Sequence, residues 1–223
     1  MLDAGAQNFL LQLSVLLIPG IFAITLHEVA HGLAAKRLGD PTAYMLGRLS
    51  LNPLKHVDPM GTIIVPLAMY FLGGIVFGWA KPVPVSFRNL RNPKRDMVLV
   101  AAAGPAANFA MALGWAVLAG LVNTLVGRDD VLSAWVVSNC NAGILLNVGL
   151  GTFNLLPIPP LDGGRVLSGL LPPNASRALD RIEPFGFIIL IVLLIAPGQP
   201  LFRLLAPFFG SLVRFYSHIA GLA

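Results

Sequence analysis

The sequence is poor in charged residues and in cysteine. Charged residues make up 11% of the 223 residues, whereas hydrophobic residues make up 56%. A soluble domain carries roughly 25% charged residues, so this chain has too little charge to cover a water-exposed globule. A single cysteine, Cys140, excludes an internal disulfide framework and a CxxC metal site. These shortages predict a protein that is embedded in a membrane.

The excess of basic over acidic residues also fits a membrane protein. Lys and Arg number 15 against 10 Asp and Glu, which gives a formal net charge of +5. The basic residues lie in loops beside apolar runs, above all in 36–60 and 79–96, as the positive-inside rule predicts for cytoplasmic loops. We therefore expect a multi-pass integral protein of a prokaryotic cell membrane, in contact with the lipid bilayer, and no binding to nucleic acid.

Apolar residues are concentrated in runs of membrane-spanning length. Three long runs cover 8–38, 97–126 and 131–156. A further run at 61–79 is interrupted by Pro66 and Gly73-Gly74, and two shorter ones follow at 182–196 and 201–213. The predicted fold is an all-α polytopic membrane protein with a three-helix core, a re-entrant or short β segment, and one or more additional C-terminal helices. We expect a single membrane-embedded domain over 1–223, with its core at about 8–170 and a C-terminal helical segment at 182–216.

The most specific motif is His27-Glu28-Val29-Ala30-His31, which lies inside the first apolar run. Histidines four residues apart project from one face of a helix, with about 5–6 Å between their Cβ atoms, and can bind one metal ion. The glutamate between them can accept a proton from water. Because ionisable side chains inside a membrane are costly, they usually mark a functional site. The chain has only four histidines and two glutamates, so this motif is unexpected by chance.

A catalytic zinc site needs three protein ligands and one open position. Asp162 is the best candidate for the third ligand. It follows the proline-rich stretch 157–160, which ends a helix at membrane depth, and precedes two glycines that allow close approach of the backbone. Broken helices within a bilayer are tolerated where they line a cavity. The sequence thus predicts one Zn²⁺ per chain, bound by His27, His31 and Asp162.

Together these motifs resemble those of the site-2 protease family of intramembrane zinc metalloproteases. The matching segments are His27-Glu-Val-Ala-His31-Gly32, Ala103-Gly-Pro-Ala-Ala-Asn108 and Asn154-Leu-Leu-Pro-Ile-Pro-Pro-Leu-Asp162-Gly-Gly. The resemblance implies a short family member without a PDZ domain, in which the two histidines and the aspartate hold zinc. It also implies that Glu28 is the catalytic base and that Asn154 contacts the substrate backbone.

The expected function is that of an intramembrane zinc metalloendopeptidase. Such an enzyme hydrolyses peptide bonds within or near transmembrane segments of membrane-protein substrates, with water activated by zinc and a glutamate general base. A metal-ion transporter and a non-catalytic membrane scaffold are the alternatives, since intramembrane His and Asp also form ion pathways. A transporter, however, has no need of a glutamate base beside its ligands.

Several further residues are candidates for substrate-binding or supporting roles. The prolines of 81–87 favour an extended segment, which is expected to bind an unwound substrate by strand addition around Val83 and Val85. Polar residues that are candidates for supporting or gating the site are His56, Asp58 and Asn108; turn and capping chemistry is the alternative for the first two. For Asn154 the alternative is a hydrogen-bonding face between helices, shared with Asn139 and Asn147.

The order of the apolar runs constrains the topology. If every run crossed the membrane once, the end of the first helix and Asp162 would lie on opposite sides. A re-entrant path for 61–79 removes this conflict and places both basic stretches on one side. We therefore expect an external amino terminus and an active site that faces the cytoplasm.

Overall fold

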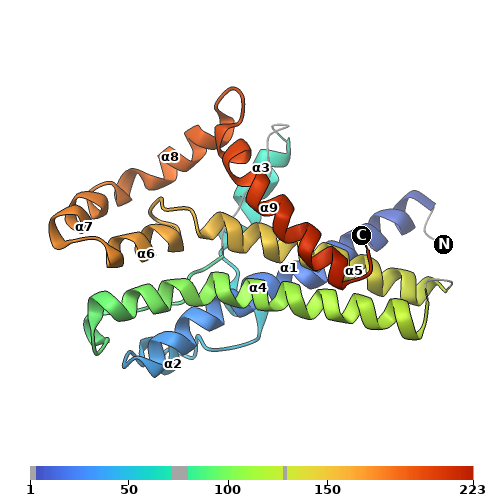
Figure 1. Cartoon of the computed structure of the whole chain (residues 1–223), viewed down its shortest axis with the longest axis horizontal. Helices are drawn as coiled ribbons and strands as arrows, with labels where there is room; N and C mark the ends of the chain where they lie inside the picture. Colours follow the sequence, from blue (N-terminus) through green and yellow to red (C-terminus); the bar gives the residue numbers. More distant parts are fainter. Residues whose placement is uncertain (1–3, 72–79, 128–129, 223) are drawn as a thin grey trace.

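The computed structural model describes residues 4–71, 80–127 and 130–222, and the regular elements within them are all helical (Figure 1). The all-α prediction is thus confirmed. In chain order the elements are α1 (Ala4–Arg37), α2 (Thr42–Met45), the 3₁₀ turn η1 (Pro53–His56), the π-helical turn η2 (Pro59–Ile64), α3 (Val65–Phe71), the 3₁₀ turn η3 (Phe87–Asn89), α4 (Pro93–Leu125), α5 (Val131–Asn154), α6 (Asp162–Leu170), α7 (Pro173–Asp180), α8 (Glu183–Ile195) and α9 (Pro200–Ile219).

Helices α1, α4 and α5 pack together as the core of the molecule (Figure 1). Among the described residues these are the helices long and apolar enough to cross a membrane, over Leu10–Arg37, Pro93–Leu125 and Val131–Asn154. Helices α1 and α5 run in one direction and α4 runs in the other. The predicted three-helix core is therefore present, with its helices close to the predicted runs.

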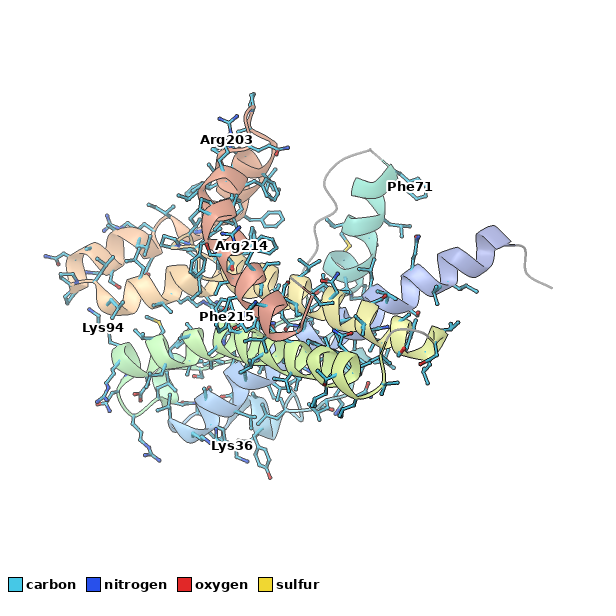
Figure 2. All side chains as sticks on the ribbon, turned by 45° about the vertical axis from the view of Figure 1, so that its right-hand side comes forward. Lys36, Phe71, Lys94, Arg203, Arg214 and Phe215 are labelled. Carbon is cyan, nitrogen blue, oxygen red and sulfur yellow. The ribbon has the colours of Figure 1, made fainter. Side chains whose placement is uncertain are left out.

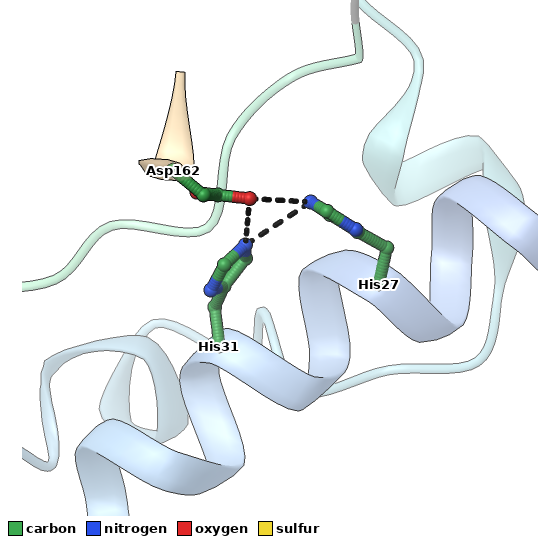
Figure 3. Close-up of side chains that lie close together, drawn as sticks. All are labelled: His27, His31 and Asp162. Atoms are coloured by element: carbon green, nitrogen blue, oxygen red, sulfur yellow. Dashed lines mark hydrogen bonds and ion pairs between the residues drawn. The ribbon is translucent and has the colours of Figure 1, made fainter. Parts of the chain in front are cut away.

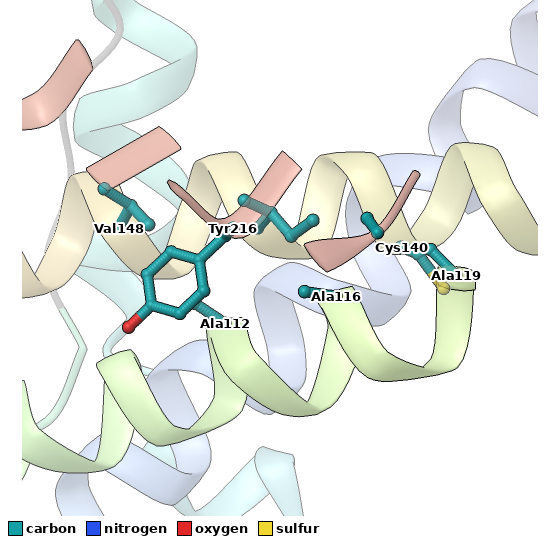
Figure 4. Close-up of a cluster of buried hydrophobic side chains, with 8 residues drawn as sticks. Ala112, Ala116, Ala119, Cys140, Val148 and Tyr216 are labelled. Atoms are coloured by element: carbon teal, nitrogen blue, oxygen red, sulfur yellow. The ribbon is translucent and has the colours of Figure 1, made fainter. Parts of the chain in front are cut away.

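Small side chains allow α4 and α5 to approach closely. Ala112, Ala116 and Ala119 recur on one face of α4 and are fully buried (Figure 4). They pack against α5 and α9 in one cluster that also contains Cys140, Ile144, Val148, Tyr216 and Ala220. The Tyr216 hydroxyl of α9 donates a hydrogen bond to the Phe109 carbonyl oxygen of α4 at 3.1 Å. This cluster explains why α9 continues to Ile219 instead of ending near residue 213.

The connection between α1 and α4 starts and ends at the same end of the core. The Arg91 backbone N–H donates to the Leu38 carbonyl oxygen at 3.0 Å. The cations Lys36 and Lys94 mark this end of the two helices (Figure 2). The end of α1 and the start of α4 therefore lie next to each other. This is required if both basic stretches, 36–60 and 79–96, are on the same side of the membrane. The predicted re-entrant run at 61–79 begins with η2 and α3, but residues 72–79 lie outside the described part of the chain.

An extended segment at 80–86 crosses the end of α1. Pro82 and Pro84 lack the N–H groups that a ladder needs, and no strand pairs with this segment in the described residues. The segment is instead attached at points along its length. Arg48 Nη2 donates to the Lys81 carbonyl oxygen at 3.0 Å, and the Ser86 N–H donates to Asp40 Oδ2 at 2.6 Å.

Asp40 is the main polar anchor of this segment. Its carboxylate is fully buried and accepts hydrogen bonds from the backbone and hydroxyl groups of Thr42, from Ser86 N–H and from Asn89 Nδ2. Burial alone raises the pKa of this carboxyl. The hydrogen bonds from Thr42, Asn89 and Ser86 outweigh that effect and hold the pKa below its ordinary value of 3.8.

Replacement of Asp40 by asparagine is expected to lower stability in a pH-dependent way. Because the folded-state pKa is lowered, the carboxylate stabilises the fold above pH 3.8, and this contribution is lost as the pH falls through the lowered pKa. Thermal unfolding in detergent should thus separate the melting temperatures of wild type and Asp40→Asn near pH 7, and the difference should shrink as the pH falls below 3.8. A gap of constant size would contradict an ionised carboxylate.

The predicted C-terminal helices are also present. Helix α8 has 13 residues, which at about 1.5 Å per residue gives roughly 20 Å, short of the ~30 Å hydrocarbon core. The chain turns between α8 and α9 at Gly198 and Gln199, which both have positive φ angles. Leu194 and Leu201 then pack together against Leu156, at the end of α5. These contacts place α8 beside the turn that leads to Asp162.

Candidate active site

The predicted metal ligands meet in one buried cluster. On α1, His27 and His31 lie one turn apart, with their Nε2 atoms separated by 3.1 Å. The Oδ2 atom of Asp162, the first residue of α6, lies 3.2 Å from the Nε2 atom of His27 and 3.3 Å from that of His31 (Figure 3). Each of the three residues is at most 9% exposed. Asp162 and the two histidines, more than 130 residues apart in sequence, thus converge on one point.

A tight turn brings Asp162 to the histidines. Helix α5 ends at Asn154, and the prolines that follow prevent its continuation. A methyl group on Gly163 would overlap the Leu155 carbonyl oxygen, and one on Gly164 would overlap the Pro159 backbone nitrogen. The two glycines therefore let α6 begin directly against the turn, which aims the carboxylate of Asp162 back at α1.

Hydrogen bonds fix both imidazoles with their Nε2 lone pairs toward Asp162. Asn108 Nδ2 donates to the Ala23 carbonyl oxygen at 3.2 Å, which leaves Asn108 Oδ1 as the acceptor for His27 Nδ1–H at 2.6 Å. His31 Nδ1–H donates to the Val100 carbonyl oxygen at 2.7 Å. With each proton on Nδ1, each Nε2 carries a lone pair that can bind a metal.

The three candidate ligand atoms fit a zinc ion. Asp162 Oδ2 is buried and has no hydrogen-bond donor among the described residues, and it faces two Nε2 lone pairs. Three such acceptors repel one another unless a cation lies between them. A tetrahedral ion with bonds of about 2.0–2.1 Å has ligand atoms about 3.3 Å apart, close to the separations observed. Two imidazoles and one carboxylate are a ligand set of catalytic zinc sites.

Gly104 of α4 makes room for the ligand cluster. A methyl group at this position would overlap His31 Nε2 and would lie 2.6 Å from the Cε1 atoms of both histidines. Gly104 belongs to the family-like segment 103–108, but its sequence context predicts no particular role for it. A glycine in the interior of a helix lowers its stability. Its presence at position 104 could therefore have indicated that a larger side chain does not fit there.

Glu28 reaches the same cavity as the metal ligands. The cavity has a volume of about 440 Å³ and is lined by Glu28, Asn154 and the three ligands. Its wall is mostly apolar and includes Val83, Val85, Phe87, Leu161, Phe187 and Leu190. Glu28 Oε2 accepts a hydrogen bond from the Val83 N–H at 2.7 Å. The carboxylate is therefore held at the edge of the cavity by the extended segment.

The two valines differ in their availability for strand addition. Val83 has its N–H bonded to Glu28, and its side chain is buried. Val85 lines the cavity and is half-buried. A substrate strand could accept a hydrogen bond from the Val83 N–H only after the bond to Glu28 breaks. Substrate binding by these residues stays a prediction.

His56 and Asp58 are not brought to the cluster. His56 Nε2 lies 2.8 Å from the Ser50 carbonyl oxygen, and Asp58 Oδ1 caps η2 by accepting from the N–H groups of Met60 and Gly61. Neither side chain lines the cavity that holds the metal ligands. Their contacts are those of turns and caps, because His56 ends the 3₁₀ turn η1 and Asp58 is the N-cap of η2.

The asparagines of α5 do not form a single face between helices. Asn139 Nδ2 and Asn154 Nδ2 donate to carbonyl oxygens one turn back in their own helix, at 2.9 Å and 3.0 Å. Asn147 Oδ1 instead accepts from Asn108 Nδ2 of α4 at 2.9 Å. Asn154 lines the cavity, as a residue that contacts substrate must, and its contact with substrate stays a prediction.

Comparisons with known proteins point to the same chemistry. The family model described as peptidase family M50 matches residues 115–197, which include Asp162. YwhC of Bacillus subtilis (strain 168) is 39% identical over 191 residues, which cover 82% of this chain and 80% of that protein. Rip2 of Mycolicibacterium smegmatis is 36% identical over 186 residues, covering 82% and 68%, and Rip2 of Mycobacterium tuberculosis H37Rv is 33% identical over 184.

The names of these relatives assign them to the zinc metalloproteases. No solved structure matches the chain at a significant level. The similarity to YwhC extends over most of both proteins, and the family model covers the segment that delivers the carboxylate ligand. The chain therefore belongs to peptidase family M50, the site-2 protease family of zinc metalloproteases.

Proposed function

We propose that this metalloprotease cleaves peptide bonds inside the membrane, with one zinc ion held by His27, His31 and Asp162 and with Glu28 as the general base. One observation carries the proposal. The three buried donor atoms lie 3.1–3.3 Å apart and share a cavity with a glutamate, and both histidines lie within a helix that is apolar enough to cross a bilayer.

Each polar group around the cavity has a place in this mechanism. Zinc, when bound, acts as a Lewis acid that polarises the scissile carbonyl and lowers the pKa of water. Glu28 accepts a proton from the water that attacks the carbonyl carbon, and returns it to the amine nitrogen as the C–N bond breaks. Asn108 and the Val100 carbonyl keep the two imidazoles in the tautomer that binds metal.

The apolar wall of the cavity supports a membrane segment as substrate. Aliphatic and aromatic side chains from the extended segment and from α8 line it, and they would accommodate apolar residues of an unwound transmembrane helix. The substrate must unwind because an intact helix hides its carbonyl groups in hydrogen bonds. Asn154, at the end of α5, would bind the exposed backbone, and Val85 would contact the adjoining side chains.

Charge supports a site that faces the cytoplasm. The ligand cluster lies toward the end of α1 that carries Lys36 and Arg37, and Lys94 and Arg95 lie in the first turn of α4. Positively charged residues flank membrane spans mainly on the cytoplasmic side. We therefore place the amino terminus outside the cell and the entrance for water on the cytoplasmic side.

Metal removal tests this function directly. Purified protein in detergent is expected to contain one zinc per chain and to cut a model substrate with one transmembrane segment. A chelator should remove both the metal and the activity, and added zinc should restore them, because no protein side chain here replaces the Lewis acid. Zinc content by elemental analysis and cleavage by gel electrophoresis measure the two quantities.

The controls separate the competing functions. An unfolded soluble protein should be a poorer substrate than the membrane segment, because the cavity wall is apolar. Equal cleavage of both would contradict an intramembrane specificity. Zinc flux through proteoliposomes without cleavage of any of a panel of membrane segments would favour a transporter.

A further inference from the structure

We propose that Asn147 of α5 is a positioning residue for the metal site, and that it acts through Asn108 on His27. The inference rests on the proposed zinc site. Asn147 Oδ1 accepts from Asn108 Nδ2 at 2.9 Å, and Asn108 Oδ1 accepts from His27 Nδ1–H at 2.6 Å. These three residues, here named the amide relay, join α5, α4 and α1 in one line of hydrogen bonds.

Backbone carbonyl groups fix the direction of the amide relay. Asn147 Nδ2 donates to the Gly143 carbonyl oxygen at 2.8 Å, and Asn108 Nδ2 also donates to the Ala23 carbonyl oxygen at 3.2 Å. A carbonyl oxygen can only accept, so each amide has its NH₂ group on a known side. Both amide oxygens are thereby directed along the relay toward a donor, and the last donor is His27 Nδ1–H.

Reversal of the relay would remove a metal ligand. If the Asn108 amide flipped, its oxygen would face the oxygens of Ala23 and Asn147, and its NH₂ group would face His27 Nδ1. The imidazole proton would then have to move to Nε2, where it would occupy the lone pair that points at Asp162. Asn147 opposes this flip, because its Oδ1 would then face the Asn108 oxygen and would lose its hydrogen-bond donor.

Burial makes the relay costly to break. Asn108 and Asn147 are both fully buried, at 0% exposure. A buried amide that loses its partner costs about 1–3 kcal/mol, so a partly broken relay is disfavoured. Helix α5 also leads, through the turn after Asn154, to Asp162. Helix α5 thus determines the position of the Asp162 carboxylate and, through the relay, the orientation of the His27 imidazole.

Asn139 offers a matched control for Asn147. It lies on the same helix and is 4% exposed. Within the part of the chain that the structure describes, however, its Nδ2 donates to the Trp135 carbonyl oxygen of its own helix and its Oδ1 has no hydrogen-bond partner. Replacement of either asparagine by leucine removes a buried amide of the same size. Only the replacement of Asn147 removes an acceptor from the amide relay.

The test measures metal binding by the full chain in detergent. Asn147→Leu is expected to weaken zinc affinity by about tenfold, the lower end of the effect of losing a partner that orients a metal ligand. Competition with a chromophoric chelator gives the affinity, and the visible absorption of the Co²⁺-substituted protein reports the ligand geometry. Asn139→Leu should leave both unchanged. Asn147→Asp keeps an acceptor oxygen toward Asn108, and its carboxyl, kept protonated by burial, still donates to the Gly143 carbonyl oxygen, so this variant should restore affinity and spectrum.

Two outcomes would overturn the relay. Asn147→Leu with wild-type zinc affinity and Co²⁺ spectrum would show that Asn147 does not position His27, and equal losses in Asn139→Leu and Asn147→Leu would reduce its role to packing. If Asn147→Leu does not fold, Asn147→Ala takes its place with the same expectations. Because the readout is metal binding, a wild-type protein that binds zinc but cleaves nothing would refute the proposed protease function and leave the relay standing.

Discussion

Replacement of Glu28 by glutamine is expected to abolish proteolysis while zinc remains bound. Glutamine has the shape of glutamate and can still accept the Val83 N–H bond, but it cannot take a proton from water. Loss of general-base catalysis slows a reaction by about 10²–10⁴-fold, which places residual cleavage near or below detection. Cleavage of the transmembrane model substrate and zinc content by elemental analysis are the two measurements.

The only other glutamate of the chain provides the control. Glu183 begins α8 and does not line the cavity that holds the metal ligands. Glu183→Gln makes the same chemical change and should leave both cleavage and zinc content at the wild-type level. Cleavage by Glu28→Gln at the wild-type rate would refute the assignment of the base. Loss of zinc from Glu28→Gln would instead make Glu28 part of the metal site.

Replacement of Gly104 by alanine is expected to remove most of the zinc, although it adds a single methyl group. That methyl would overlap His31 Nε2. The imidazole cannot easily withdraw, because its Nδ1–H is bonded to the Val100 carbonyl oxygen of the same helix, α4. We expect zinc affinity to fall by at least about 100-fold, the upper end of the effect of disturbing the support of a metal ligand.

The same helix contains a glycine for comparison. A methyl group on Gly114 would meet no atom of the described residues within 4 Å. Gly114→Ala should therefore bind zinc normally, and it should be as stable as wild type or more so by up to about 1 kcal/mol, because alanine is the better helix former. Competition with a chelator compares the two variants. Wild-type affinity in Gly104→Ala would mean that the imidazoles can repack around the methyl group.

The site residues that sequence predicted are those set by local geometry. His27 and His31 share a face because four residues make about one turn of a helix, and this holds wherever the helix packs. Asp162 was predicted from its own neighbours, since prolines and glycines signal a broken helix whatever lies opposite. The three long spans followed from apolar runs in the same way, and their observed limits differ from the runs by a few residues at the ends.

Contacts between helices were the part that sequence left open. Asn108 lies 81 residues from His27, and Asn147 lies 39 residues from Asn108. Their pairing depends on the rotation of α4 and α5 about their axes, and a pattern of apolar residues on all sides gives little information about that rotation. The same uncertainty hid the role of Gly104. His56 and Asp58 are the opposite case, because they follow the motif in the chain but lie in turn and cap positions outside the cavity that holds the metal ligands.

The hydrogen bond between Leu38 and Arg91 joins the two ends of the connection between α1 and α4, so the length of that connection can vary. Since the two ends of this long connection are tied to each other, a chain lengthened or shortened ahead of Ala80 would still deliver α4 to its place beside α1. The turn between α5 and α6 has no such freedom, because α6 begins in direct contact with it. Inserted sequence should thus be tolerated in the first connection and rejected by the second.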